Sequence, residues 1–289
     1  VEERRGQEAP QNDLTHRALD LVARLAAREE ERNQGQSGAE RGHQHGRQPL
    51  PVAATDGFTE GNTLRHQVLV VADQQTKGRG RLGRVWVTNP GAALAFTIVV
   101  RPSTVEQSQV ALFSPLAGMA ICQALLDLNL PAKIKWPNDV LLARRKTCGI
   151  LAESSWQGSL PQAVVIGIGI NVGPSSVPPT DMVQFPATCV EQHTNQPVDR
   201  WKLLREVLTG FFTWREKLGT DEFFRTWEDQ LAFRGETVYL LNSGGETITG
   251  TLLGVDAQGS LRIRQADGME KRVSVGDVHL RPESKPGGN

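Results

Sequence analysis

The chain has 289 residues, and its 32 basic and 32 acidic side chains give a formal net charge of +0 at pH 7. That length is sufficient for one large domain and a small one. The balanced charge provides no overall field that would attract nucleic acid or a membrane surface. No apolar run approaches the ~20 residues of a membrane span, and residues 1–6 lack the apolar core of a signal peptide.

The cysteines and histidines show no metal-ligand spacing. Cys122, Cys148 and Cys189 are few and widely separated, and they form no disulfide framework. Such cysteine usage favours a reducing compartment. The sequence therefore predicts a cytoplasmic protein with no metal-ligand set.

A helical pattern and a polar segment occupy the first sixty residues. Apolar residues recur at helical spacing from Leu14 to Leu25, and Asp13 can cap this helix at its start. Residues 28–50 are rich in Gly, Gln, Arg and Glu and hold little that could be buried. We therefore expect a disordered insertion over residues 28–60.

A loop rich in glycine and arginine follows the strand pattern at residues 68–72. Residues 78–84 read Gly-Arg-Gly-Arg-Leu-Gly-Arg. Glycines allow the backbone to approach a ligand closely, and arginines match the oxygens of phosphates and carboxylates. The loop is predicted to fold over a polyanion, and a solvated basic loop is the alternative.

The glycine spacing also fits the Gly-x-Gly-x-x-Gly pattern of dinucleotide-binding folds. That pattern requires a helix at the third glycine and an acidic residue roughly 20 positions later. Here residues 84–88 and 94–100 are β-branched and aromatic, as in strands, with a turn at 89–91 between them. The sequence therefore excludes a dinucleotide site of this kind.

The central part of the chain combines a core helix with strands. Residues 109–128 are apolar nearly all round, which predicts a buried helix with Pro115 in its first turns. Alternation at 133–136 predicts a strand that Pro137 ends, followed by turn residues. A further strand is predicted at 148–153.

A third central strand, at residues 163–172, contains Gly167 and Gly169. Glycines inside a strand mark the close approach of a ligand or of another backbone, and tight packing is an equal alternative.

The C-terminal part changes from helices to short strands. A proline-rich loop at 174–186 precedes helical patterns at 199–218 and 220–231. Five short strands separated by tight turns are typical of a small SH3-like β-barrel. These strands are predicted at 237–241, 247–255, 260–264, 271–275 and 278–281.

Four segments of this sequence, taken together, resemble the biotin protein ligases, also called biotin–[acetyl-CoA-carboxylase] ligases. The similar segments are residues 75–86, 135–139, 146–151 and 167–171. They occur in the family's order and spacing, and the similarity extends over residues 67–281. The arginine-glycine loop and Lys-Trp-Pro-Asn-Asp together favour biotin over lipoate.

The resemblance implies an α+β fold in two parts. A class II synthetase-like catalytic domain of the biotin–lipoate ligase type, a mixed sheet with helices, is expected over residues 1–232. The SH3-like barrel is expected over residues 233–282, with a tail at 283–289.

The resemblance also implies the reaction. Enzymes of this family join biotin to ATP, hold biotinyl-5′-AMP and pass biotin to one lysine of a biotin carboxyl carrier domain, as in acetyl-CoA carboxylase. ATP and biotin are then the substrates, and Mg²⁺ accompanies them. A lipoate–protein ligase-like enzyme and a non-catalytic binding relative are the alternatives, and a homodimer remains open.

Site residues are carried over from the family by position. Catalytic roles are expected for Lys146 and Arg81, near the biotin carboxylate and the phosphate, and Asp139 is our candidate for orienting the target lysine. An Asx turn after Pro137 is the structural alternative for Asp139. Biotin contacts are expected at Gln75, Gly78, Arg79, Gly80, Arg81, Trp86, Lys146, Gly149 and Gly167. Nucleotide contacts are expected at Asn138, Asn171, Arg79 and Arg84.

The N-terminal segment departs from the family pattern. Family members usually carry a Ser and a Thr there whose hydroxyls contact biotin, and Pro10 and Gln11 align with them. Biotin is then expected to bind roughly ten- to a hundred-fold more weakly than in relatives that retain both hydroxyls. An alternative alignment places Thr15 at this position. No sequence for a DNA-binding helix-turn-helix is present, so DNA binding is not expected.

Overall fold

The computed structural model describes residues 68–183, 185–241, 247–274 and 279–282. The helix expected at 14–25, the insertion expected at 28–60 and the altered positions Pro10 and Gln11 lie outside these ranges.

A six-stranded sheet forms the larger part of the molecule. Its spatial order is β1-β2-β6-β5-β4-β3, and each neighbouring pair is antiparallel. The strands are β1 (Val68–Ala72), β2 (Ala93–Val100), β3 (Lys133–Lys135), β4 (Asp139–Leu142), β5 (Arg145–Gln157) and β6 (Leu160–Asn171).

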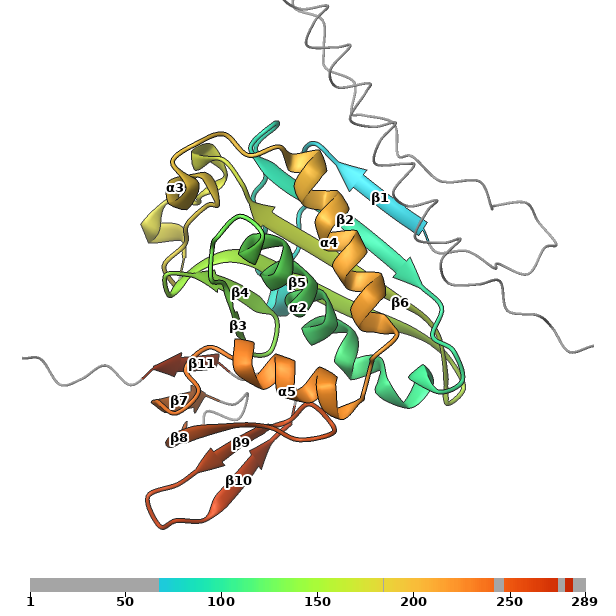
Figure 1. Ribbon diagram of the computed structural model, residues 1–289, viewed down its shortest axis with the longest axis vertical. Coiled ribbons are helices and arrows are strands. Elements are labelled where there is room, and N and C mark those ends of the chain that lie inside the picture. Colours follow the sequence, from blue (N-terminus) through green and yellow to red (C-terminus); the bar gives the residue numbers. More distant parts are fainter. Residues whose placement is uncertain (1–67, 184, 242–246, 275–278, 283–289) are drawn as a thin grey trace, which may run out of the picture.

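Two helices, α2 (Phe113–Leu126) and α4 (Arg200–Arg215), cover one face of this sheet (Figure 1). The core lies between the helices and the sheet, because alternate residues of β6, Val164 to Ile170, are buried against the helices. The opposite face of β6 carries Gly167 and Gly169. The sheet therefore has one face packed against the helices and an opposite face that carries these two glycines.

The buried helix predicted at 109–128 is confirmed as α2, which a 3₁₀ segment, η2 (Glu106–Leu112), precedes. Pro115 lies in the first turn of α2, as expected. By length and composition, the stretch Glu106–Leu126 is long and apolar enough to cross a membrane. The prediction that no apolar run approaches the length of a membrane span was therefore wrong. The fold buries 67% of the most apolar part of this stretch, as in the core helix of a globular domain.

The remaining helices are short or lie near the domain junction. Asp199 caps α4, since its Oδ1 accepts hydrogen bonds from the N–H groups of Trp201 and Lys202. These elements are η1 (Arg81–Gly83), η3 (Pro174–Ser176), η4 (Thr180–Met182), α3 (Glu191–Thr194) and α5 (Asp221–Gln230).

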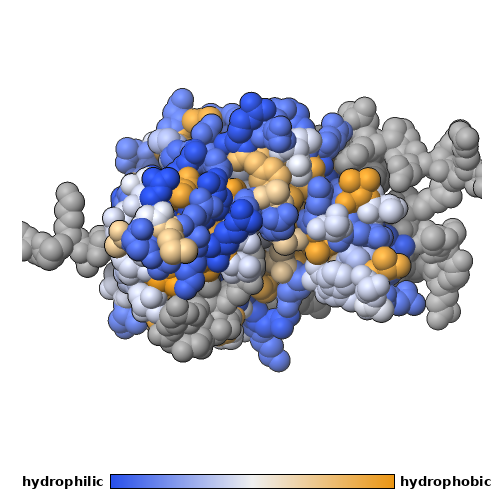
Figure 2. Space-filling model, turned by 90° about the horizontal axis from the view of Figure 1, so that it is seen from below, coloured by the Kyte–Doolittle hydropathy of each residue, from blue (hydrophilic) through white to orange (hydrophobic). Residues whose placement is uncertain are grey.

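A smaller five-stranded sheet follows α5 and lies beside the edge of the large sheet that carries β3 (Figure 1). All five strands predicted for the barrel are present, in the spatial order β10-β9-β8-β7-β11. They are β7 (Thr237–Leu241), β8 (Thr247–Val255), β9 (Leu261–Arg264), β10 (Glu270–Val273) and β11 (His279–Pro282). Figure 2, which views the molecule from this end, shows a mainly hydrophilic surface interrupted by separate hydrophobic patches.

Two local predictions were wrong. Asp139 begins a strand, β4, that the sequence did not indicate. The turn between β4 and β5 is formed by Ala143 (φ 46°) and Arg144 (φ 62°), a type I′-like geometry that usually carries Asn or Gly. Conversely, residues 84–88 form no strand. They contribute only an isolated bridge between Val85 and Arg79, because the chain here folds back on the loop rather than joining the sheet.

Candidate active site

A single row of residues crosses the large sheet on the face opposite the helices. In register, Lys135 of β3 pairs with Asp139 of β4, which pairs with Gly149 of β5, which pairs with Gly169 of β6. The row continues with Ala95 of β2. Paired residues point to the same face of a sheet. The row therefore places charged side chains at one end and a shelf without bulky side chains beside them.

The charged end of the row is a compact cluster. Nζ of Lys146 lies 2.6 Å from Oδ1 of Asp139, and Nζ of Lys135 lies 3.5 Å from Oδ2 of the same carboxylate. Burial opposes the charge of Asp139, but Lys146 and Lys135 outweigh it and hold the pKa of this carboxyl below its usual range. The side chain of Lys146 is 25% exposed, compared with 7% for Lys135. Lys146 is therefore the cation of this cluster that a ligand can reach.

Backbone contacts hold Lys146 in place. Its N–H donates to the carbonyl of Pro186 at 2.7 Å, and its carbonyl accepts from the N–H of Thr188 at 2.9 Å. The register shifts at this point, so that Leu141 pairs with Lys146 and Thr147 becomes the extra residue of a bulge. This irregularity turns the side chain of Lys146 toward Asp139, away from a regular ladder position.

The arginine-glycine loop reaches over the same face of the sheet. Its two ends pair, since the N–H of Trp86 donates to the carbonyl of Gly78 at 3.0 Å. A Cβ at Gly78 would overlap the carbonyl oxygen of Trp86, so this close approach requires glycine. Arg79 lies 4.0 Å from Glu153 of β5 in an exposed ion pair. The loop is thus placed above β5.

Trp86 lies on the glycine shelf. A Cβ at Gly149 would come within 3.0 Å of its ring, and a Cβ at Gly169 would overlap its indole. Nζ of Lys146 is 5.7 Å from the ring centroid. The indole N–H is buried and has no hydrogen-bond partner within the part of the chain that the structure describes.

The surface next to Trp86 is open at Gly167. A Cβ at Gly167 would meet only Leu151, at 3.7 Å or more. A ligand can therefore lie against the sheet above Gly167, next to the glycine that the indole covers.

The site residues predicted in and near the loop differ in solvent exposure. Gln75, Arg79 and Arg84 are exposed, and Gly80 and Arg81 are partly buried in the loop. The N–H of Gly80 donates to the carbonyl of Arg84, which closes the tip of the loop.

The two asparagines make structural hydrogen bonds. Asn138 donates from Nδ2 to the carbonyl of Ile150 at 2.7 Å, and Asn171 donates from Nδ2 to the carbonyl of Thr188 at 3.1 Å. Asn171 is 3% exposed. Their contacts with a nucleotide remain predictions.

Sequence reasoning missed two members of the site. Lys135 is recognised only once the cross-strand register is known, and the same register places Gly169 in the row. Thr188 lies just after the proline-rich loop and contacts Lys146 through an isolated parallel bridge between Lys146 and Ala187, which has no local sequence signal.

We expect Gly169→Ala to push the indole of Trp86 off the shelf and to reduce stability by about 1–3 kcal/mol, because the added methyl overpacks a filled space. Fluorine NMR of 5-fluorotryptophan-labelled protein, with the Trp86 signal assigned by Trp86→Phe, would show that signal moving. Gly167→Ala is the matched control and leaves it in place. A Trp86 signal that is unmoved in Gly169→Ala would contradict this geometry.

Two family models match the chain. The Biotin/lipoate A/B protein ligase family matches residues 47–171, and the Biotin protein ligase C terminal domain matches residues 234–281. The fold and the site together thus define a protein of the biotin/lipoate ligase class.

Comparison with similar proteins distinguishes the biotin protein ligases from the other members of this class. The Biotin--[acetyl-CoA-carboxylase] ligase of Paracoccus denitrificans is 35% identical over 70% of this chain and 85% of its own length. The Bifunctional ligase/repressor BirA of Bacillus spizizenii is 32% identical over 76% of this chain and 68% of its own length. The solved structure of the biotin protein ligase from Aquifex aeolicus in complex with biotin and ATP has a TM-score of 0.65 and 32% identity, covering 74% of this chain and 89% of that one. The chain belongs to the biotin protein ligase family, which confirms the resemblance seen in the sequence.

Proposed function

We propose that this protein is an ATP-dependent ligase that forms biotinyl-5′-AMP and transfers biotin to a specific lysine of a biotin carboxyl carrier protein. Family membership supports the reaction, and one structural observation carries it. The row from Lys135 and Asp139 across Gly149 and Gly169 sets a reachable cation, Lys146, beside the Trp86 indole that covers the two glycines.

The open surface above Gly167 suits the first substrate, biotin. The space above Gly167 is flanked by the Trp86 indole, whose flat apolar ring can pack on a hydrocarbon chain. Biotin carries such a chain and ends in a carboxylate. With its chain beside Trp86, the carboxylate points toward Lys146.

The first step joins two anions. The carboxylate of biotin is already ionised at pH 7 and needs no base to attack the α-phosphate. The barrier comes from charge repulsion and from positioning, so cationic groups must supply most of the catalysis. Lys146 provides a fixed charge, because Asp139 and the backbone of residues 186–188 hold it. Arg79 and Arg81 provide further positive charge from the loop, which reaches over the same face of the sheet.

The loop also retains the intermediate. A mixed anhydride is hydrolysed if water reaches it, so the loop has to cover it until the carrier arrives. The pairing of Gly78 with Trp86 fixes the base of the loop, and Arg81 begins its tip, η1. We therefore assign Arg81 to the phosphate of the adenylate.

Removal of Arg81 is expected to release the adenylate. Losing a hydrogen bond to a charged group costs about 1.5–3 kcal/mol, so Arg81→Gly should raise the rate of adenylate escape roughly ten- to a hundred-fold. Free biotinyl-AMP would then label lysines on an added bystander protein, which a streptavidin blot detects. Lys77→Gly removes an exposed cation from the same loop and should retain the adenylate. Escape from Arg81→Gly as slow as from wild type would remove Arg81 from this role.

We propose that Mg²⁺ arrives with the phosphates of ATP. Mg²⁺ is commonly held by substrate phosphates and water with only one or two carboxylates. Within the described residues no group of three or more His, Cys, Asp or Glu side chains lies together. Both oxygens of Asp139 are paired with lysines. The described residues therefore do not form a dedicated magnesium site.

The second step requires a neutral amine, although a free lysine has a pKa near 10.4. We propose that the negative charge of the ionised Asp139 orients the incoming ammonium group next to the adenylate and helps it to lose its proton to water. The neutral amine then attacks the biotinyl carbonyl, and AMP leaves. The partner is then the biotin-carrying domain of a carboxylase such as acetyl-CoA carboxylase, and we propose that the reaction takes place in the cytoplasm.

One assay tests the proposed function. Purified protein with ATP and Mg²⁺ should release pyrophosphate when biotin is added and should not do so with lipoate. Release with lipoate alone would indicate a lipoate–protein ligase. Biotin binding without pyrophosphate release would indicate a non-catalytic relative.

A further inference from the structure

Strands β3, β4 and β5 form two successive hairpins that share β4 and are together called the catalytic hairpin here. They carry the three side chains of the charged cluster, Lys135, Asp139 and Lys146. The same hairpin forms the edge of the large sheet next to the C-terminal barrel. Two of its residues, Trp136 and Arg144, are neighbours of site residues in sequence and contact the barrel directly.

Trp136 makes the buried contact. It directly follows Lys135, it is 1% exposed, and its Nε1–H donates to the carbonyl of Gly259 at 3.0 Å. Gly259 closes the turn between β8 and β9 at a positive φ of 80°, which favours glycine. Asp256 braces this turn, because its Oδ1 accepts from the N–H groups of Gln258 and Ser260. The acceptor for Trp136 is thus held rigidly by the barrel.

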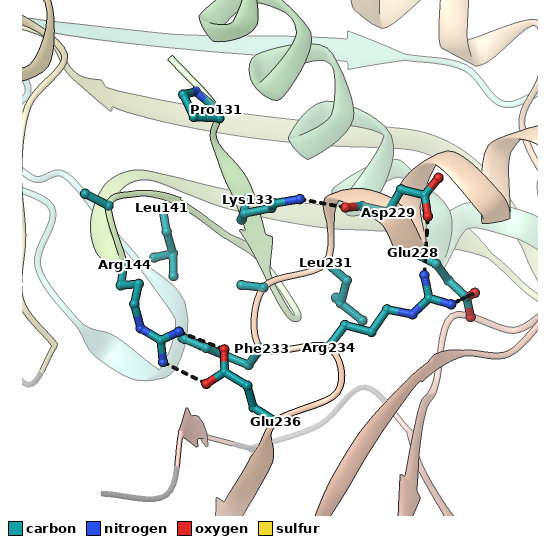
Figure 3. A pocket seen from close by; sticks show the side chains of 12 residues that line it. Pro131, Lys133, Leu141, Arg144, Glu228, Asp229, Leu231, Phe233, Arg234 and Glu236 are labelled. Carbon is teal, nitrogen blue, oxygen red and sulfur yellow. Dashed lines mark hydrogen bonds and ion pairs between the residues drawn. The ribbon is translucent and has the colours of Figure 1, made fainter. Parts of the chain in front are cut away.

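Arg144 makes the second contact at the opposite corner of the hairpin, two residues before Lys146. Its Nη1 and Nη2 donate to the two carboxylate oxygens of Glu236 at 2.7 and 2.9 Å, and its guanidinium lies 4.8 Å from the ring centroid of Phe233 (Figure 3). A two-point Arg–carboxylate pair fixes orientation as well as distance.

The linker between α5 and the barrel closes the junction. The N–H of Ala232 donates to the carbonyl of Ile134, and Nζ of Lys133 donates to the carbonyl of Asp229. A cavity of about 500 Å³ lies between these contacts (Figure 3). Its charged lining is matched internally, since Arg234 pairs with Glu228 and Asp229. The cavity therefore offers no excess charge to a ligand and belongs to the domain junction.

We propose that the C-terminal barrel positions the catalytic hairpin, with Trp136 and Arg144 as positioning residues for Asp139 and Lys146. Neither residue touches the substrate space above Gly167. They act by fixing the two corners of the hairpin on a rigid neighbouring domain. This inference rests on the proposed ligase activity, which needs Lys146 and Asp139 in one geometry.

The first test removes the buried hydrogen bond of Trp136 and retains an aromatic side chain. In Trp136→Phe, kcat for biotin-dependent pyrophosphate release should fall roughly ten- to a hundred-fold, with KM for biotin less affected, because misplacement of a catalytic group by about 1 Å costs up to that much. Hydrogen exchange of the peptide covering residues 139–149 in the ligand-free protein should become faster.

The second test uses charge reversal. Arg144→Glu and Glu236→Arg each place like charges together and should lower kcat several-fold. The combined variant restores an ion pair and should recover most of the loss. Arg262 and Glu270, which form a similar two-point pair inside the barrel, give the matched control. Their single reversals should leave kcat and the exchange of residues 139–149 unchanged.

The outcomes separate the two proposals. A wild-type protein that releases no pyrophosphate overturns the ligase activity, and hydrogen exchange then decides whether the barrel orders the hairpin. An active wild type whose Trp136→Phe variant keeps both kcat and slow exchange overturns the positioning role. The absence of recovery in the combined Arg144 and Glu236 variant overturns it for Arg144.

Discussion

Lys146→Ala is expected to lower the rate of adenylate formation roughly 10²–10³-fold, since an electrostatic contact that stabilises the developing charge is typically worth that much. The effect should appear in kcat more than in KM for biotin. Lys146 stands at the edge of the shelf with 25% of its side chain exposed, and Asp139 and backbone hydrogen bonds fix its position. Pyrophosphate release under single-turnover conditions measures the loss.

Folding of this variant should survive, because Lys135 still faces the Asp139 carboxylate at 3.5 Å. Lys202→Ala, which removes an exposed cation from α4, is the control and should leave the rate unchanged. Lys146→Arg offers a further check, because its bulkier planar head cannot replace the ammonium at 2.6 Å from Oδ1 without moving Asp139. Near-normal release by Lys146→Ala would exclude Lys146 from the site.

Local patterns in the sequence were sufficient for the elements that depend on composition. The nearly all-apolar run became α2, and the five short strands with tight turns became the smaller sheet. For the glycines of β6 the sequence left two explanations open, and at Gly169 the structure favours tight packing, because the side chain of Trp86 lies against it.

What sequence reasoning could not supply is the register. Lys135 enters the site because β3, β4 and β5 align it with Asp139 and Gly149, and β4 itself was missed. The turn that creates β4 uses Ala143 and Arg144 at positive φ, so the usual Asn or Gly signal is absent. Non-local backbone contacts, such as that of Thr188 with Lys146, have no periodicity to detect.

The physical link between these observations is that one buried carboxylate organises two cations. Asp139 accepts from Lys146 and Lys135, and these two cations offset the cost of burying its charge. The same pairing fixes the direction of Lys146 toward the shelf. Stability of the hairpin and geometry of the site therefore depend on the same three side chains.

Asp139→Asn is accordingly expected to cost about 3–5 kcal/mol of unfolding free energy at pH 7, because it leaves two lysines facing each other without an anion. The pKa of Asp139 is lowered in the folded protein, since the two lysines outweigh the opposing effect of burial. A carboxyl with a lowered folded pKa stabilises the fold above its unfolded pKa, near 3.9, and that stability is lost as pH falls through the folded pKa. The difference between wild type and Asp139→Asn should thus be largest above about pH 5 and shrink below pH 4.

Urea unfolding followed by circular dichroism between pH 3 and 7 measures this difference. Glu222→Gln is the matched control, because Glu222 lies 2.6 Å from Lys217 in an ion pair whose side chains are 55% and 41% exposed. Such a surface pair is worth at most about 1 kcal/mol, so the control should unfold nearly as wild type does at every pH. If Asp139→Asn differs from wild type by no more than this control at pH 7, the carboxylate does not organise the two lysines. If the difference stays constant down to pH 3, the loss has a cause other than the charge of Asp139.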